Sequence, residues 1–162
     1  MAPVSFEPIG VVHSPFEEAS GMPIQPASAA GVTGHVEIYA RYEAGLRDLA
    51  GFSHVLVVAH LHRARAGDLE LVPFLDDEPR GVFATRAPSR PNPIGLSALR
   101  LLGIDGNRLH VAGVDLLDGT PVLDLKPYVP EFDAIAADRI GWYEGKLGAI
   151  LSARSDGRQS VD

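Results

Sequence analysis

The chain has 162 residues, 46% of them hydrophobic, and a net charge of −7 at pH 7. This length suits a single domain, and this hydrophobic content is too high for a disordered chain. The lack of cysteine excludes disulfides and Cys-based zinc sites. The acidity argues against a general nucleic-acid-binding surface, so any contact with RNA needs a local basic patch.

The N-terminal residues do not combine a basic region with an apolar stretch, so the sequence predicts no signal peptide. The longest apolar runs are too short to cross a bilayer. We therefore expect a protein of the cytoplasm with no membrane contact. The 17 glycines and 13 prolines are spread along the chain, which favours many turns between short elements and a mainly β architecture.

The first predicted element is a strand over residues 4–13, with Pro8 at an edge or at its start. A loop follows over residues 14–31, where three prolines argue against any helix. Val36 and Ile38 alternate with polar neighbours, the period of a half-buried strand. Residues 40–50 suit a short helix or turn that Gly51 ends.

The continuous apolar run over residues 54–60 predicts a strand buried on both sides. A polar loop is expected over 63–80 and the start of a short strand over 82–84. Residues 96–104 and 109–114 flank Asp105-Gly106-Asn107, which predicts a hairpin. The next strand, 122–126, places Val122, Asp124 and Lys126 on one face.

The C-terminal part shows apolar residues at helical spacing over 140–151, which predicts a C-terminal helix interrupted by glycines. Residues 152–162 are expected to be frayed. The chain carries no internal repeat and no linker. We therefore expect one domain over residues 1–162, with a core at about 6–130 and a helical tail at about 135–155.

The segment from Gly81 to Ser97 is the most informative, because three prolines stiffen a loop that presents Arg86, Arg90 and Asn92. Arginines on a rigid frame suit a carboxylate or a phosphate, which they bind through two parallel hydrogen bonds. A rigid surface loop with solvated arginines is the alternative.

Two further segments carry polar groups. Asp118-Gly119-Thr120-Pro121 is typical of a tight turn. Asp118 either accepts hydrogen bonds from backbone amides of this turn or lies at the rim of a pocket. His60 and His62 stand at the end of a buried strand, where residues two apart face the same side, so a metal site is conceivable. No third ligand is apparent, however, and residues at the end of a central strand more often line a pocket. We predict no metal. No Gly-x-Gly-x-x-Gly, P-loop or Gly-x-Ser-x-Gly pattern occurs.

Phe83-Ala84-Thr85-Arg86 followed by Arg90-Pro91-Asn92-Pro93-Ile94-Gly95 closely resembles the signature of the TsaA-like proteins, also called the TrmO family. The similarity extends to residues 8–16, 51–54 and 115–128 in collinear order. It covers about residues 6–130, and its central motif is long and specific.

This resemblance implies a small closed or nearly closed β-barrel with antiparallel or mixed strands and short helices. It implies a homodimer that binds S-adenosylmethionine and methylates N6 of threonylcarbamoyl-adenosine at position 37 of tRNA. The cofactor-binding residues carried over by matching position are Gln25, Pro26, His62, Arg63, Arg86, Leu96, Asp115, Leu116, Leu117 and Asp118. In this assignment Arg86 meets the cofactor's carboxylate and an aspartate its ribose. Asn92, Asp118 and Tyr128 are the candidates for the catalytic hydrogen-bond acceptor.

The chain departs from the family pattern at two positions: Ile24 stands where an arginine is usual, and Ala87 where a serine or threonine is usual. It also ends where longer members of the family continue into a C-terminal domain. The positive charges available for tRNA are Arg63, Arg65, Arg80, Arg86, Arg90 and Arg100. Two alternatives remain: a methyltransferase acting on a small molecule, and a non-catalytic S-adenosylmethionine-binding protein.

Overall fold

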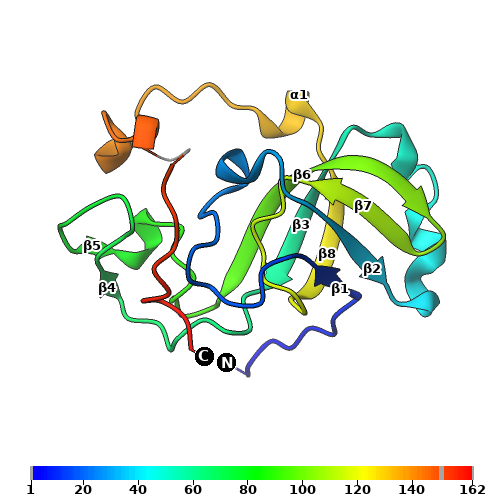
Figure 1. Ribbon diagram of the computed structural model, residues 1–162, viewed down its shortest axis with the longest axis horizontal. Coiled ribbons are helices and arrows are strands. Elements are labelled where there is room, and N and C mark those ends of the chain that lie inside the picture. The colour runs from blue at the N-terminus through cyan, green and yellow to red at the C-terminus, as the bar shows by residue number, and fades with distance from the viewer. Residues whose placement is uncertain (1, 150–151, 162) are drawn as a thin grey trace.

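The computed structural model describes residues 2–149 and 152–161. Six strands form a closed antiparallel barrel in the order β1-β2-β7-β6-β3-β8 (Figure 1). The barrel strands are β1 (Gly10–His13), β2 (Thr33–Ile38), β3 (His54–His60), β6 (Ile94–Asp105), β7 (Arg108–Ala112) and β8 (Pro121–Pro127). The prediction of a mainly β protein built on a small barrel is therefore confirmed.

The remaining elements are short and lie outside the barrel sheet. Strands β4 (Glu70–Leu71) and β5 (Arg80–Gly81) pair with each other, and α1 (Pro130–Asp133) is a single turn of α-helix. Single 3-10 turns or short 3-10 helices cover Pro26–Ala29, Ala40–Leu46, Leu49–Gly51, Val82–Ala84, Gly141–Tyr143 and Leu147–Ala149. No helix among residues 2–149 and 152–161 is long and apolar enough to cross a membrane.

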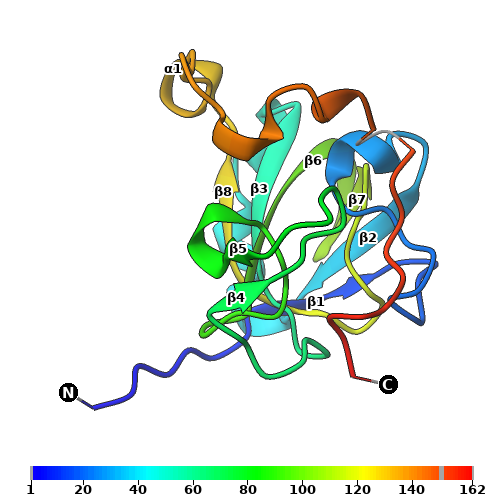
Figure 2. The same cartoon turned by 90° about the vertical axis from the view of Figure 1, so that its left-hand side faces the viewer.

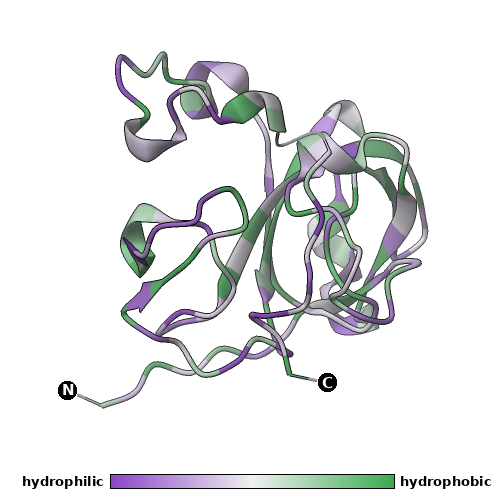
Figure 3. Cartoon of the chain, turned by 60° about the vertical axis from the view of Figure 1, so that its left-hand side comes forward, coloured by the Kyte–Doolittle hydropathy of each residue, from purple (hydrophilic) through white to green (hydrophobic). Residues whose placement is uncertain are grey.

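Side chains alternate along each barrel strand, so every second one points into the barrel core. Val55, Val57 and Ala59 are fully buried, while the side chains between them on β3 are only half-buried. The prediction that β3 is buried on both sides is wrong, because its second face lies on the outside of the barrel. Figure 3 shows the barrel strands carrying both hydrophobic and hydrophilic segments. The core residues are Val12, Val36, Ile38, Leu49, Val55, Val57, Ala59, Leu99, Leu109, Val111, Val114, Leu116 and Val122.

A β-bulge on β8 changes which of its side chains face the core. Ala59 pairs with Val122 and Val58 with Asp124, so one step on β3 corresponds to two on β8. Val122 is therefore in the core and Leu125 packs against the same core. The predicted strict alternation over residues 122–126 is wrong for this reason.

The β6–β7 hairpin forms where the turn residues predict it. Asp105 pairs with Arg108, and the two loop residues between them begin with Gly106 at a φ of 57°. Positive φ at this position is what a two-residue hairpin turn requires and what glycine adopts without strain.

Three local predictions are corrected. The first strand is confined to Gly10–His13, although Ile9 still donates a backbone hydrogen bond to Val122. The loop over residues 14–31 does contain one 3-10 turn, Pro26–Ala29, since a proline is tolerated at the first helical position. Residues 82–84 form a 3-10 turn rather than a strand.

The C-terminal segment passes above the barrel after α1, and its last part runs beside the N-terminal loop (Figure 2). Instead of one helix it forms two 3-10 turns, because Gly141 and Gly145 adopt positive φ values of 60° and 76° and break the helical path. Ile150 and Leu151 of the predicted helix lie outside the described residues. Beyond them the chain is not frayed: Arg154 bridges to Pro23 and Ser160 to Ala64.

Candidate functional site

A cavity of about 710 Å³ lies between the barrel and the C-terminal segment. Its walls come from the loop that precedes β2, the segment after β3, the Pro-rich segment before β6 and the loop after β7. The C-terminal segment closes the remaining side. This volume lies in the range of pockets that hold small molecules or cofactors.

The Pro-rich segment is held in shape by its own side chains. The Arg90 guanidinium donates to the backbone carbonyls of Thr85 and Ala87 at 3.2 and 3.3 Å. The Thr85 hydroxyl donates to the Val82 carbonyl at 2.9 Å. Arg90, which also lines the cavity, therefore holds the loop in shape through one of its guanidinium nitrogens.

The other arginine of the motif, Arg86, is exposed and lines the cavity. Its guanidinium donates to the Gln25 side-chain oxygen at 3.4 Å, so these two residues meet across the cavity. A guanidinium offers several further donors in one plane, and the arrangement suits a carboxylate or phosphate. The alternative of a solvated surface arginine is thereby disfavoured for Arg86.

The Asp115 carboxylate forms the acidic part of the wall. The Ser97 hydroxyl donates to its Oδ1 at 2.7 Å. Burial raises the pKa of Asp115 to about 6, against the opposing effects of the Ser97 hydrogen bond and the Arg86 charge. This carboxyl changes its charge near neutral pH and is suited to accept hydrogen bonds from hydroxyl or amino groups.

The segment after β3 contributes His62 and Arg63. Burial, together with the nearby His60 and Arg63, lowers the pKa of His62. The Arg63 guanidinium donates to the Glu17 carbonyl at 2.6 Å and so ties this segment to the N-terminal loop. Leu61 lies against Gly95, and a Cβ added at this glycine would stand 2.8 Å from a Leu61 methyl carbon.

Most of the residues predicted from the sequence meet at this cavity. Those that line it are Gln25, His62, Arg63, Arg86, Asn92, Leu96, Asp115, Leu116 and Leu117. Pro26, Asp118 and Tyr128 are absent from the described lining. Pro26 begins the 3-10 turn beside the cavity, and the positions that depart from the family pattern, Ile24 and Ala87, both belong to the lining.

Asp118 and Tyr128 have other partners. Asp118 accepts a hydrogen bond from the Ser14 backbone amide at 3.1 Å, which agrees with the capping interpretation of its turn. The Tyr128 ring lies edge-on to His54, with 6.1 Å between ring centroids, at the far end of β8. Their roles in catalysis stay predictions.

Sequence analysis missed the C-terminal wall. Trp142, Tyr143 and Gln159 line the cavity, and the Trp142 indole donates to the Ala84 carbonyl at 2.7 Å. Gln159 is 5% exposed, and neither atom of its side-chain amide has a partner among the described residues. No local motif marks these residues, because only long-range contacts bring them to the cavity.

An ion-pair cluster holds the C-terminal segment against the β4–β5 region. The Asp76 side chain is 6% exposed and accepts from Lys146 at 2.5 Å and from Arg80 at 2.7 Å. These hydrogen bonds, Lys146 first, hold the pKa of Asp76 well below its usual range. Arg80 is thus engaged within the protein, which reduces the positive charge available to RNA.

Sequence and structure comparisons agree on one family. The model of the tRNA-methyltransferase O N-terminal domain matches residues 11–134. A probable S-adenosyl-L-methionine-binding protein of Pyrococcus abyssi is 48% identical over 96% of this chain and 84% of its own length. The tRNA (adenine(37)-N6)-methyltransferase of Mus musculus is 39% identical over 79% of this chain and 31% of its own.

A crystal structure of TrmO from Pseudomonas aeruginosa superposes with a TM-score of 0.73 at 41% identity. The match covers 87% of this chain and 63% of that one, so this chain spans less than two thirds of its solved relative. Since the family model matches most of the chain and the barrel is shared, the protein belongs to the TrmO (TsaA-like) family, through that family's N-terminal domain.

Proposed function

We propose that the protein binds S-adenosylmethionine in this cavity and methylates N6 of threonylcarbamoyl-adenosine at position 37 of tRNA. The observation that supports this most is the convergence of Arg86, Asp115 and six leucines on one cavity in a chain of the TrmO family. The Pyrococcus abyssi relative is named for binding S-adenosyl-L-methionine, and the mouse relative for methylating adenine 37 of tRNA.

The residues present fit this cofactor. Arg86 offers a planar guanidinium for the carboxylate of the methionine part, and the Asp115 carboxylate offers an acceptor for ribose hydroxyls. Leu96 and Leu117 provide apolar surface for the adenine. The unpartnered Gln159 amide stands in the same wall and adds a donor and an acceptor.

S-adenosylmethionine supplies an electrophilic methyl group on its sulfonium when it is bound. The protein's task is to orient the accepting nitrogen toward that methyl group and to exclude water. Arg86 and Asp115 would anchor the two polar ends of the cofactor, and the C-terminal segment would cover it. The leucine side chains of the lining would exclude water from the space between these two residues.

Little base strength is needed at the accepting nitrogen, because the acyl group on N6 makes its N–H more acidic than that of an ordinary amine. Asn92, Asp118 and Tyr128 are our candidates for the acceptor of this hydrogen bond. Asn92 is favoured by position, since it is exposed and lines the cavity.

The tRNA is proposed to meet the cavity side of the protein, where Arg86 is exposed, and residues 1–162 to act as one unit in the cytoplasm. We also propose a homodimer. Phe83, Phe132 and Ile135 are 78%, 77% and 85% exposed, and a second copy would cover apolar side chains of this kind.

Two other functions are kept for specific reasons. A small-molecule substrate is favoured by the net charge of −7 and by Ile24 in the cavity wall where the family usually has arginine. A non-catalytic role is favoured by the name of the Pyrococcus abyssi relative, which states binding alone. Both functions require cofactor binding and predict no methylation of tRNA.

The test is methyl transfer from labelled S-adenosylmethionine to two preparations of one tRNA, with and without threonylcarbamoyl-adenosine at position 37. We expect label only in the modified tRNA. Arg86→Ala should abolish this labelling. Arg47→Ala should keep it, because Arg47 directly follows the 3-10 helix Ala40–Leu46 and does not belong to the described cavity lining.

Cofactor binding by calorimetry separates the alternatives. Binding without label on either tRNA would refute the tRNA substrate and favour a small molecule or a binding role. An absence of binding to the wild-type protein would refute the cofactor assignment itself.

A further inference from the structure

Three histidines lie side by side on the outside of the barrel. His13 on β1 pairs directly with His35 on β2, and His35 pairs with His110 on β7. Residues opposite each other in antiparallel strands point to the same face. Their neighbours Val12 and Val36 are fully buried, so the imidazoles point outward, away from the core.

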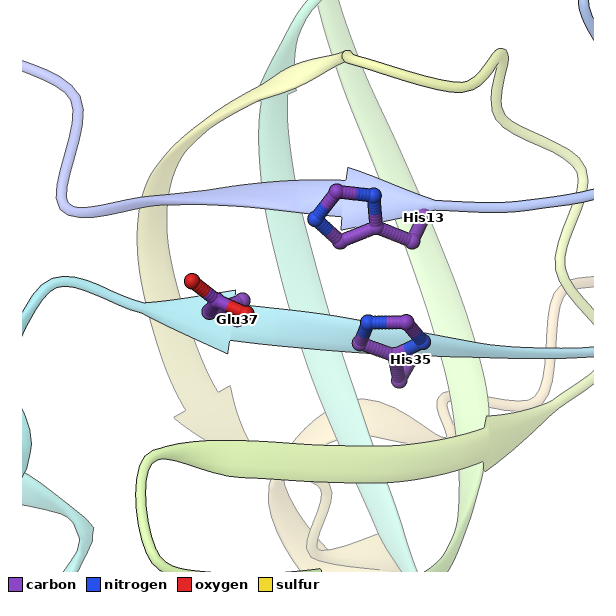
Figure 4. Close-up of side chains that lie close together, drawn as sticks. All are labelled: His13, His35 and Glu37. Carbon is purple, nitrogen blue, oxygen red and sulfur yellow. The ribbon is translucent and has the colours of Figure 1, made fainter.

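The side chains of His13, His35 and Glu37 bring potential metal-ligand atoms together. One such atom from each residue lies within 4.8 Å of the other two. The His13 and His35 rings stack with 4.5 Å between centroids, and Glu37 follows on the same face of β2 (Figure 4). Zinc bonds of about 2.0–2.1 Å place two ligands roughly 3.4 Å apart, so small side-chain rotations would complete the site.

A carboxylate stands beside one of the imidazoles. Asp118 Oδ1 lies 3.5 Å from His13 Nδ1, which leaves His13 Nε2 to face a ligand. Metal-binding histidines usually donate their second ring nitrogen to such a carboxylate. His13 is 39% exposed, so an ion would reach the group directly from solvent.

One internal contact competes with metal binding. The Arg108 guanidinium donates to Glu37 Oε2 at 2.9 Å, directly across the β2–β7 pair. Ion pairs that are this exposed contribute little stability. A divalent ion held by two imidazoles as well would therefore displace Arg108 from the carboxylate.

We propose that His13, His35 and Glu37 bind a Zn²⁺ ion on the outer face of the barrel, with water at the fourth position. Two histidines and a glutamate are a ligand set that zinc accepts. The ion would join β1 to β2. Through Asp118 it would also stabilise the loop after β7, whose Leu116 and Leu117 line the cavity. The site is independent of the methyltransferase proposal.

The test is titration of the untagged full chain with ZnCl₂ by calorimetry, and with CoCl₂ by visible absorption. We expect one ion per chain and at least tenfold weaker binding in both His35→Asn and Glu37→Gln. Arg108→Gln should bind more tightly, because it releases Glu37. The matched control is His60→Asn, an exposed histidine outside the cluster, which should bind as the wild type does.

Three results would overturn the proposal. The first is no saturable 1:1 binding by the wild-type chain. The second is unchanged binding in His35→Asn and Glu37→Gln, whose folding is checked by thermal unfolding in EDTA. The third is loss of binding in His60→Asn alone, which would move the ion to the His60–His62 pair.

Discussion

We expect Asp115 to make the free energy of unfolding depend on pH near neutrality. Its carboxyl lies in the cavity wall and accepts the Ser97 hydroxyl, and burial raises its pKa from 3.8 to about 6. The informative change is Asp115→Asn, which keeps the shape of the side chain and removes its charge at every pH. Asp138→Asn, at an exposed position, is the matched control.

The magnitude follows from the two pKa values. A carboxyl with a raised pKa stabilises the folded state below pH 3.8, and this contribution is lost as pH rises through about 6. Each pH unit between the two values corresponds to about 1.4 kcal/mol, so the ionised group costs the folded protein about 3 kcal/mol at pH 7. The asparagine side chain does not ionise, so the variant lacks this pH-dependent destabilisation.

The assay is urea unfolding of wild type and both variants between pH 4 and 8. Relative to wild type, Asp115→Asn should gain about 2 kcal/mol of unfolding free energy as pH rises from 4 to 7, while Asp138→Asn should follow the wild type throughout. Ser97→Ala should move the change to higher pH, because the serine hydroxyl stabilises the ionised form. A constant difference between Asp115→Asn and wild type would refute the reasoning.

Two further predictions concern the walls of the cavity. In Gly67→Ala the added Cβ would stand only 2.3 Å from the Arg90 carbonyl carbon, so the loop would have to shift. We expect the free energy of unfolding to fall by about 1–3 kcal/mol and cofactor binding to weaken, measured by urea unfolding and calorimetry. Gly45→Ala, with open space around it, should change neither. Lys146→Ala removes a charged hydrogen bond to the Asp76 carboxylate, which should lower the urea midpoint and expose the C-terminal segment to proteolysis, whereas Lys126→Ala, in an exposed pair, should not. Unchanged proteolysis in Lys146→Ala would contradict the proposed attachment.

The barrel strands were predictable to the extent that their signals are local. Alternation at Val36 and Ile38 and the turn at Gly106 depend on the residues themselves and their immediate neighbours. The burial of β3 was predicted wrongly from its apolar run, because Leu56 and Val58 lie half-buried on the outer face of the barrel. The bulge on β8 occurs in its pairing with β3 and has no signal in residues 122–126.

The candidate site was predictable as a set of segments but not as a set of roles. The motif placed Arg86 and Arg90 in one loop, yet only the tertiary structure shows that Arg86 donates to Gln25 while Arg90 donates to carbonyls of the loop itself. Asp118 likewise faces Ser14 and His13, away from the described cavity lining. Sequence position alone does not determine the direction of a side chain.

The amino-acid sequence by itself determined the mainly β class, the family and the segments that build the cavity, because periodicity, turn residues and motifs are properties of neighbouring residues. The tertiary structure decided which side chains meet. Barrel closure brings Ser97 to Asp115 and aligns His13 with His35, and the C-terminal segment completes the cavity through contacts such as Lys146 with Asp76. Such contacts join residues far apart in the chain, so their formation depends on the closed fold and on packing that no local pattern encodes.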